Sequence, residues 1–188
     1  NRPHVITAAD VNAAGTLLAT VEEGDANGHI VRLWSLPGLQ PRGQVGDHSE
    51  KIRHVRIAPD GNSLVTASSD GTARVFRLTG ERITNIRIGL PVRFATFSSN
   101  GQQLLTCSVG KGGSAQLWRV NDATEVLHFQ GHRNPMWGSL NSKGAWAATS
   151  ARDGTTCIWP TDPVAIAKRL PIQSTNSAAS ASPPKKTR

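Results

Sequence analysis

The sequence contains few cysteines, few aromatic residues and no long apolar run. Among 188 residues there are two cysteines, one methionine and no tyrosine, and aromatic residues make up 5% of the chain. Cys107 and Cys157 have no Cys-x-x-Cys pair or Cys/His cluster around them, so neither a metal site nor a disulfide framework is predicted. No segment is long and apolar enough for a membrane helix, and no leader-like segment is visible. We therefore expect a soluble, cytoplasmic chain without metal or cofactor.

Glycine, proline and positive charge are the abundant features. The 18 Gly and 11 Pro residues, with only 18% charged residues, favour turns over long helices and so a β-rich domain. The net charge of +8 is compatible with an anionic partner. Part of this charge lies near the end of the chain, after the last Asp, in Lys168, Arg169, Lys185, Lys186 and Arg188. Residues 171–188 are too rich in Ser, Ala and Pro to bury a core, and we expect a disordered basic tail there.

An internal repeat is the strongest signal in the sequence. Four apolar-aromatic pairs recur at intervals of 42, 42 and 41 residues: Leu33-Trp34, Val75-Phe76, Leu117-Trp118 and Ile158-Trp159. A Gly-containing turn precedes each pair, as in the Asp-Gly turns at 70–71 and 153–154, and such turns join hairpin strands. The runs ahead of these turns, TLLATV, SLVTAS, QLLTCS and AWAATS, read as strands buried on both faces.

Two more strands complete each unit. A second set of turns ends at Gly15, Gly61, Gly101 and Gly144, and an alternating stretch precedes each of them. A further strand candidate follows each aromatic; the last, PVAIAKRL at 163–170, is equally compatible with a short helix. The sequence thus predicts four units of four strands.

This pattern of strands, hairpins and aromatics resembles the WD-repeat (WD40) family of β-propellers over roughly residues 4–169. The resemblance implies an all-β fold of four-stranded antiparallel blades in residues 1–170, with units at about 4–45, 46–87, 88–130 and 131–170. Propellers of the family usually have about seven or eight blades. Three arrangements stay open: the C-terminal part of a larger protein, which the start at Asn1 favours, two copies that complete a ring, or a compact four-bladed ring.

In that family a His, a Ser or Thr at the end of the second strand, the hairpin Asp and the third-strand Trp form a hydrogen-bonded structural network. By position, the second unit supplies His48, Ser68, Asp70 and Phe76, and the fourth supplies His132, Asp153 and Trp159, with Ala151 in the hydroxyl position. The first and third units keep Trp34 and Trp118 but have Gly in the Asp position. Because each network lacks a member, we expect the blades to depend on apolar packing.

The same assignment argues against an enzyme. His48, Ser68 and Asp70 are the residue types of an acyl-transfer triad, but the resemblance assigns all three to the structural network. No Gly-x-Ser-x-Gly elbow occurs, and Gly110–Gly113 lacks the second half of a phosphate-binding loop. We therefore predict a non-catalytic protein.

The resemblance also implies which residues contact a partner. Proteins of the family bind partners with residues shortly after the first-strand His and with the residue before the hairpin Asp. These positions correspond to Lys51, Arg53, Arg93, Lys111, Trp137 and Arg152. The fourth unit is one residue short between His132 and Gly144, which leaves the exact place of Trp137 open. Gathered on one face, such residues suit an acidic or phosphorylated segment; equally, they are ordinary solvated residues at loop tips.

Two classes of function follow. The first is a scaffold that binds proteins or peptides on the propeller face, with self-association through open edges. The second is a nucleic-acid-binding module that uses the basic rim and tail, which the absence of tyrosine disfavours. The segment WPTDPVAIAKRLP also resembles the end of some bacterial WD-repeat kinase fusions, so a regulatory domain of a larger enzyme is a third interpretation.

Overall fold

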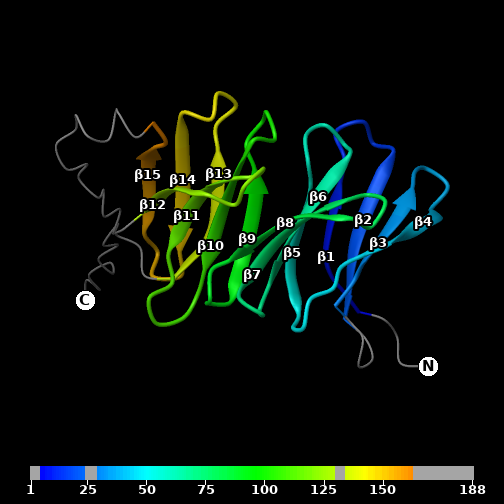
Figure 1. The fold of residues 1–188 in the computed structure, drawn as a ribbon, viewed down its shortest axis with the longest axis horizontal. Helices are drawn as coiled ribbons and strands as arrows, with labels where there is room; N and C mark the ends of the chain where they lie inside the picture. The colour runs from blue at the N-terminus through cyan, green and yellow to red at the C-terminus, as the bar shows by residue number, and fades with distance from the viewer. Residues whose placement is uncertain (1–4, 24–28, 130–133, 163–188) are drawn as a thin grey trace, which may run out of the picture.

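The computed structural model describes residues 5–23, 29–129 and 134–162, where all regular structure is β-strand (Figure 1). His132, the segment 163–170 and the tail at 171–188 lie outside the described residues. Three sheets have four strands, and the fourth sheet has three within the described residues. Each sheet is an antiparallel meander in chain order, as the sequence predicts.

The strands of the first two sheets are β1 (Val5–Val11), β2 (Leu17–Glu23), β3 (Val31–Ser35) and β4 (Gln40–Val45), then β5 (Ile52–Ile57), β6 (Ser63–Ser68), β7 (Thr72–Arg77) and β8 (Arg82–Arg87). The third sheet contains β9 (Val92–Phe97), β10 (Gln103–Ser108), β11 (Ala115–Arg119) and β12 (Glu125–Phe129). The fourth contains β13 (Pro135–Leu140), β14 (Trp146–Ala151) and β15 (Thr156–Pro160). The repeated aromatic therefore lies in the third strand of every sheet.

The sheets stack face to face, and one rule describes the three interfaces between them. The aromatic of one sheet packs against aliphatic side chains from the sheet before it: Phe76 joins the cluster of Leu33, Trp118 that of Val75, and Trp159 that of Leu117. The second strands β6 and β10 are buried on both faces, because each lies between two neighbours. This interleaving supplies the apolar packing that holds the array together.

The two outer faces of the stack are different. On the fourth sheet Trp146 is 37% exposed and Ile158 58% exposed, and on the first sheet Trp34 is only half-buried. The expectation that every second strand is buried on both faces is therefore wrong for β14, since within the described residues no sheet covers its outer face.

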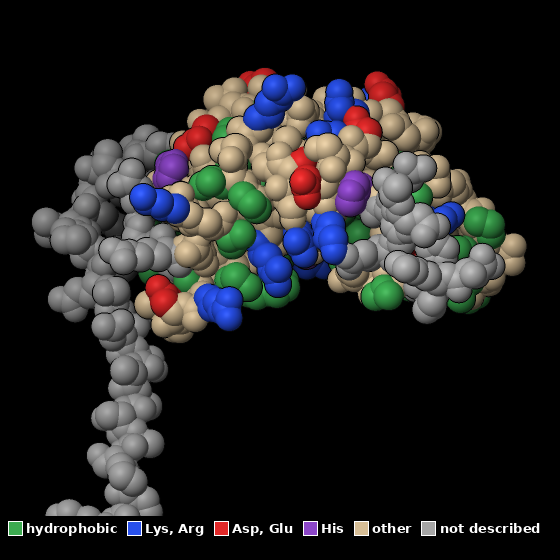
Figure 2. Space-filling view, turned by 90° about the horizontal axis from the view of Figure 1, so that it is seen from below, with side chains coloured by type: hydrophobic (Ala, Val, Ile, Leu, Met, Phe, Trp, Pro, Cys, Tyr) green, Lys and Arg blue, Asp and Glu red, His purple; other side chains and the backbone are tan. Residues whose placement is uncertain are grey.

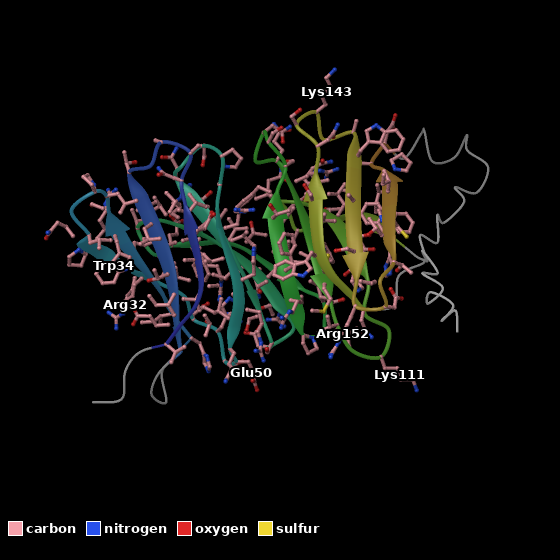
Figure 3. The ribbon with its side chains drawn as sticks, turned by 180° about the vertical axis from the view of Figure 1, so that it is seen from behind. Arg32, Trp34, Glu50, Lys111, Lys143 and Arg152 are labelled. Carbon is pink, nitrogen blue, oxygen red and sulfur yellow. The ribbon has the colours of Figure 1, made fainter. Side chains whose placement is uncertain are left out.

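The first strands of the four sheets, β1, β5, β9 and β13, run side by side along one edge of the array (Figure 3). Each has a β-bulge near its N-terminal end, where one residue has no partner on the second strand. The bulged residues are Thr7, Arg53, Arg93 and Met136. A bulge twists the strand locally and changes the direction of a side chain, so this row of bulges shapes the surface nearby.

Candidate partner-binding face

A cavity of about 240 Å³ lies at the N-terminal ends of the first strands. Thr7, Glu22, Lys51, Arg53, Arg93 and Trp137 line it, together with the buried side chains of Val21 and Ile52. All four sheets contribute to this lining, although the residues are up to 130 positions apart in the chain. Figure 2 views the molecule from this side and shows Lys and Arg side chains gathered near the middle, next to hydrophobic side chains.

The two arginines of the cavity occupy equivalent positions. Arg53 and Arg93 are the bulged residues of β5 and β9, and Thr7 is the bulged residue of β1. Ser69, in the hairpin turn between β6 and β7, accepts a hydrogen bond of 2.7 Å from Nε of Arg53. Its backbone N–H donates to the carbonyl of Lys51 at 2.9 Å. The turn thereby fixes the Arg53 side chain at the edge of the cavity.

The charges around the cavity are predominantly positive. Three cations line it, and the one carboxylate in its lining, Glu22, accepts a hydrogen bond from Nε of Arg32 at 2.7 Å. Among the described residues, neither Arg53 nor Arg93 has a carboxylate within ion-pair distance. An unpaired guanidinium beside a cavity can bind an anion without first losing a partner.

Trp137 forms the aromatic side of the cavity. It is 52% exposed, and its ring centroid lies 5.6 Å from that of Phe94 and 6.4 Å from that of His54, in edge-to-face arrangements. The rings of His54 and Phe94 are 4.3 Å apart. Three neighbouring first strands thus bring their aromatic rings together in one cluster, of which Trp137 lines the cavity.

The register corrects the position expected for Trp137. His54 pairs with Ala67, Phe94 with Cys107 and Trp137 with Ser150, so these three residues are equivalent. The residue that corresponds to Arg53 and Arg93 is Met136, not Trp137. The shortened segment before β13 moves the fourth unit by one residue, yet the Trp137 side chain still reaches the cavity.

Lys111 and Arg152 lie apart from the cavity. Both are exposed on hairpin loops, and Figure 3 shows them at the lower edge of the array, the edge where Glu50 also lies. Neither lines the cavity, and nor does Glu50. Of the six residues expected to meet a partner, the structure gathers Lys51, Arg53, Arg93 and Trp137 and leaves these two on the periphery.

The structural network in the second sheet includes a residue that the sequence comparison missed. Nδ1 of His48 lies 2.8 Å from a carboxylate oxygen of Asp70, and its Nε2 lies 2.6 Å from the hydroxyl oxygen of Thr66. The hydroxyl partner of His48 is thus Thr66 and not Ser68. Phe76 is buried beside the network, with its ring 6.4 Å from that of His48.

Ser68 has a separate role. Its hydroxyl lies 3.0 Å and 3.1 Å from the carbonyls of Glu50 and Lys51, and it accepts a hydrogen bond from the backbone N–H of Asp70 at 3.1 Å. These bonds tie the cavity edge to the hairpin turn. Because His48 is bonded to Thr66 instead, the three triad-type residues do not form a nucleophile and base pair.

Burial and hydrogen bonds together shift the pKa values of His48 and Asp70. Burial lowers the pKa of His48 below its usual value, although Asp70 opposes the shift. Burial alone would raise the pKa of Asp70, but hydrogen bonds from Thr72 and His48 outweigh it and lower that pKa. Arg74 donates a hydrogen bond to the carboxylate of Asp70 at 3.3 Å and another to the backbone carbonyl of Asp47 at 2.8 Å. The carboxylate therefore stays ionised and fully bonded inside the blade.

The other three sheets use threonine in a simpler way. The indole N–H of Trp34, Trp118 and Trp159 donates to a threonine hydroxyl on the second strand of the same sheet, at 2.9, 2.8 and 2.8 Å. The acceptors are Thr20, Thr106 and Thr149. A threonine at the same register in each second strand, Thr20, Thr66, Thr106 or Thr149, was the available signal. In the fourth hairpin, Asp153 accepts hydrogen bonds from the backbone N–H and the hydroxyl of Thr155 at 2.9 and 2.6 Å.

Stacked antiparallel meanders of this kind, with their first strands along one edge, are the blades of a β-propeller. The family model WD40, described as "WD domain, G-beta repeat", matches residues 39–77 and 123–160. Each match runs from the last strand of one sheet to the third strand of the next. The two matched segments are therefore WD repeats of this family.

Curated relatives support this assignment. The chain is 29% identical over 154 residues to "Eukaryotic translation initiation factor 3 subunit I" of Culex quinquefasciatus, which covers 74% of this chain and 47% of the relative. It is 28% identical over 138 residues to "Pre-mRNA-processing factor 19 homolog 2" of Arabidopsis thaliana, which covers 69% and 26%. It is 31% identical over 110 residues to "WD repeat-containing protein WDS homolog" of the same plant, which covers 56% and 20%. The chain thus spans less than half the length of these relatives.

Proposed function

We propose that this protein is a non-catalytic scaffold whose cavity face binds an acidic segment of a partner protein. Proteins with WD repeats generally act as interaction scaffolds, and the finer assignment rests on one observation. Arg53 and Arg93 occupy equivalent bulges beside one cavity and have no carboxylate partner among the described residues. A carboxylate-bearing partner would supply the missing charges.

A nucleic-acid-binding role has weaker support. Binding of single strands relies on several exposed aromatics along a basic groove, whereas Trp137 is the one aromatic residue that lines this cavity. A short acidic peptide needs only a cluster of arginines and one anchor, which the cavity provides.

The test of the proposed function is a charge-reversal experiment with a matched control. We expect R53E/R93E to lower the affinity for fluorescein-labelled 12-residue peptides rich in Asp and Glu by at least about tenfold, measured by fluorescence anisotropy. The control, K111E/R152E, makes the same change of net charge on exposed loops outside the cavity. An equal loss in both double variants would show that binding depends on diffuse surface charge, and unchanged binding in R53E/R93E would exclude this face.

We also propose that the chain associates with further copies through its two end faces. The support is the exposed apolar surface at Trp146 and Ile158 at one end and the half-buried Trp34 at the other. Uncovered sheet faces of this kind favour association.

A further inference from the structure

Two guanidinium groups meet at one cavity because the same irregularity recurs on adjacent strands. The bulges of β5 and β9 bring Arg53 and Arg93 to the same opening, and Lys51 adds a third cation. Ser69 holds Nε of Arg53, which leaves the two Nη groups of that side chain for a ligand. The arrangement offers several donors to a single anionic head group.

The cavity is small for an extended ligand. At about 240 Å³ it lies below the range of roughly 300–1,000 Å³ that is typical of pockets for whole small molecules. One side chain with a compact head group is the size of ligand that fits. The remainder of the partner would lie across the face outside the cavity.

We propose that the cavity binds the phosphoryl group of a phosphorylated side chain in the partner protein. This inference rests on the proposed function and names the chemistry of the group that enters the cavity. A phosphomonoester carries about −1.5 to −2 charges at neutral pH and three acceptor oxygens, so it can accept donors from two guanidinium groups at once. A single carboxylate carries one charge and two acceptor oxygens, so it balances only one of the two guanidinium charges.

The charge balance favours the dianion. Among the described residues, Arg53 and Arg93 have no carboxylate within ion-pair distance. A carboxylate would balance one of these two guanidinium charges, whereas a phosphomonoester balances about two. A phosphodiester, as in nucleic acid, carries one charge per group and lacks the third terminal oxygen.

Trp137 provides a second, apolar contact for the partner. Its ring is half-exposed beside the arginines and is supported by edge contact with Phe94 and His54. A rigid aromatic at the rim can anchor an apolar residue next to the phosphorylated one, because little side-chain freedom is lost on binding. The expected motif is therefore a phosphorylated residue flanked by an apolar residue.

The experiment compares three pools of fluorescein-labelled 11-residue peptides with degenerate flanks and a central phosphoserine, glutamate or serine. Binding to the full 188-residue chain is measured by fluorescence anisotropy. We expect the phosphoserine pool to bind at least about tenfold more tightly than the glutamate pool, and inorganic phosphate to compete. R53Q and R93Q should each remove this preference, while R152Q, which lies outside the cavity, should keep it.

Arg53→Lys separates geometry from charge, because lysine keeps the cation but cannot bind two oxygens in a planar fork. A phosphoserine preference that falls in R53K as well as in R53Q supports the inference. Circular dichroism spectra and thermal transitions that match the wild type show that each variant is folded.

The other outcomes overturn the inference in different ways. Equal binding of the phosphoserine and glutamate pools, lost in R53E/R93E, would exclude phosphoryl recognition and leave the proposed function standing. Tighter binding of a 15-nucleotide single-stranded DNA, lost in the same variants, would assign the cavity to a phosphodiester. No binding of any pool would overturn both proposals.

Discussion

His54 shows how one buried side chain can determine a response to pH. It is half-buried, with its ring centroid 4.3 Å from that of Phe94 and 6.4 Å from that of Trp137, and its Nδ1 has no hydrogen-bond partner. Burial and the charge of Arg56 lower the pKa of His54 to about 4, against the opposing effects of a backbone hydrogen bond to Ala95 and the charge of Asp10. The imidazole is therefore neutral in the folded protein at neutral pH.

We predict that the free energy of unfolding falls as the pH drops from 6.5 towards 4. The unfolded chain binds a proton at His54 in this window, and the folded chain does not until the pH approaches 4. One such site contributes a slope of up to about 1.4 kcal/mol per pH unit. Urea denaturation at pH 7, 6 and 5 measures the slope, and H54F should flatten it. His48, whose pKa is also lowered, keeps its own contribution. An unchanged slope in H54F would mean that His54 is not the source.

Several site residues were accessible from the sequence, because their positions follow from repeat spacing. Counting from His48 located Lys51 and Arg53, counting back from Gly101 located Arg93, and the structure places all three at one cavity. The role of Thr66 was not accessible in this way, since spacing cannot show which of two hydroxyls on one strand faces His48. Thr66 and Ser68 are two residues apart and face the same side of β6, so the position of His48 along the strand decides which hydroxyl it contacts.

At the scale of elements, β13 is the strand on which the fourth sheet depends. It packs against β9 and β10 of the third sheet, and Gly138 lies at the contact. A Cβ atom at Gly138 would lie 2.7 Å from Cδ2 of Leu105, a side chain that is fully buried. Close approach of the two sheets therefore requires glycine at this position.

We predict that Gly138→Ala destabilises the protein by about 1–3 kcal/mol, because the fully buried Leu105 side chain must shift within the core. Gly38→Ala is the matched control, since its added Cβ would find its nearest neighbour at 3.8 Å, an ordinary contact. The free energies of unfolding in urea give the comparison. Equal stability of the two variants would show that the interface between β13 and β10 adjusts without cost.

The strands themselves were largely predictable, and the bulges were not. Apolar runs and Asp-Gly turns locate β6, β7 and β14 within a residue or so of their observed bounds. The bulges that present Arg53 and Arg93 leave no mark in composition, because they arise from pairing with the second strand. The fourth unit is one residue short before β13, and this shifts the register of Trp137 against β14. Like the bulges, the shift becomes visible only in the strand pairing.

At the scale of the whole molecule, the stacking rule leaves two faces without a neighbouring sheet among the described residues. Inside the array each aromatic packs on the aliphatic face of the preceding sheet. The aromatic face of the first sheet, with Trp34, and the aliphatic face of the fourth, with Ile158, correspond to the two sides of each interface inside the array. A second copy of the chain carries both faces, so copies can stack head to tail, either in an open series or in a closed ring.

We therefore predict that the mass of the purified chain, measured by light scattering behind a sizing column, rises with concentration above the 20.0 kDa of one copy. Ile158→Glu should return the mass to that of the monomer, because it places a charge where apolar contact is required. Ile83→Glu, at an exposed site on the outer strand β8, should leave association unchanged. A limit at twice the single-chain mass would indicate two arrays closing into a ring, whereas continued growth would indicate open head-to-tail stacking. A monomer at every concentration would show that burial of these two faces does not offset the entropy lost on association.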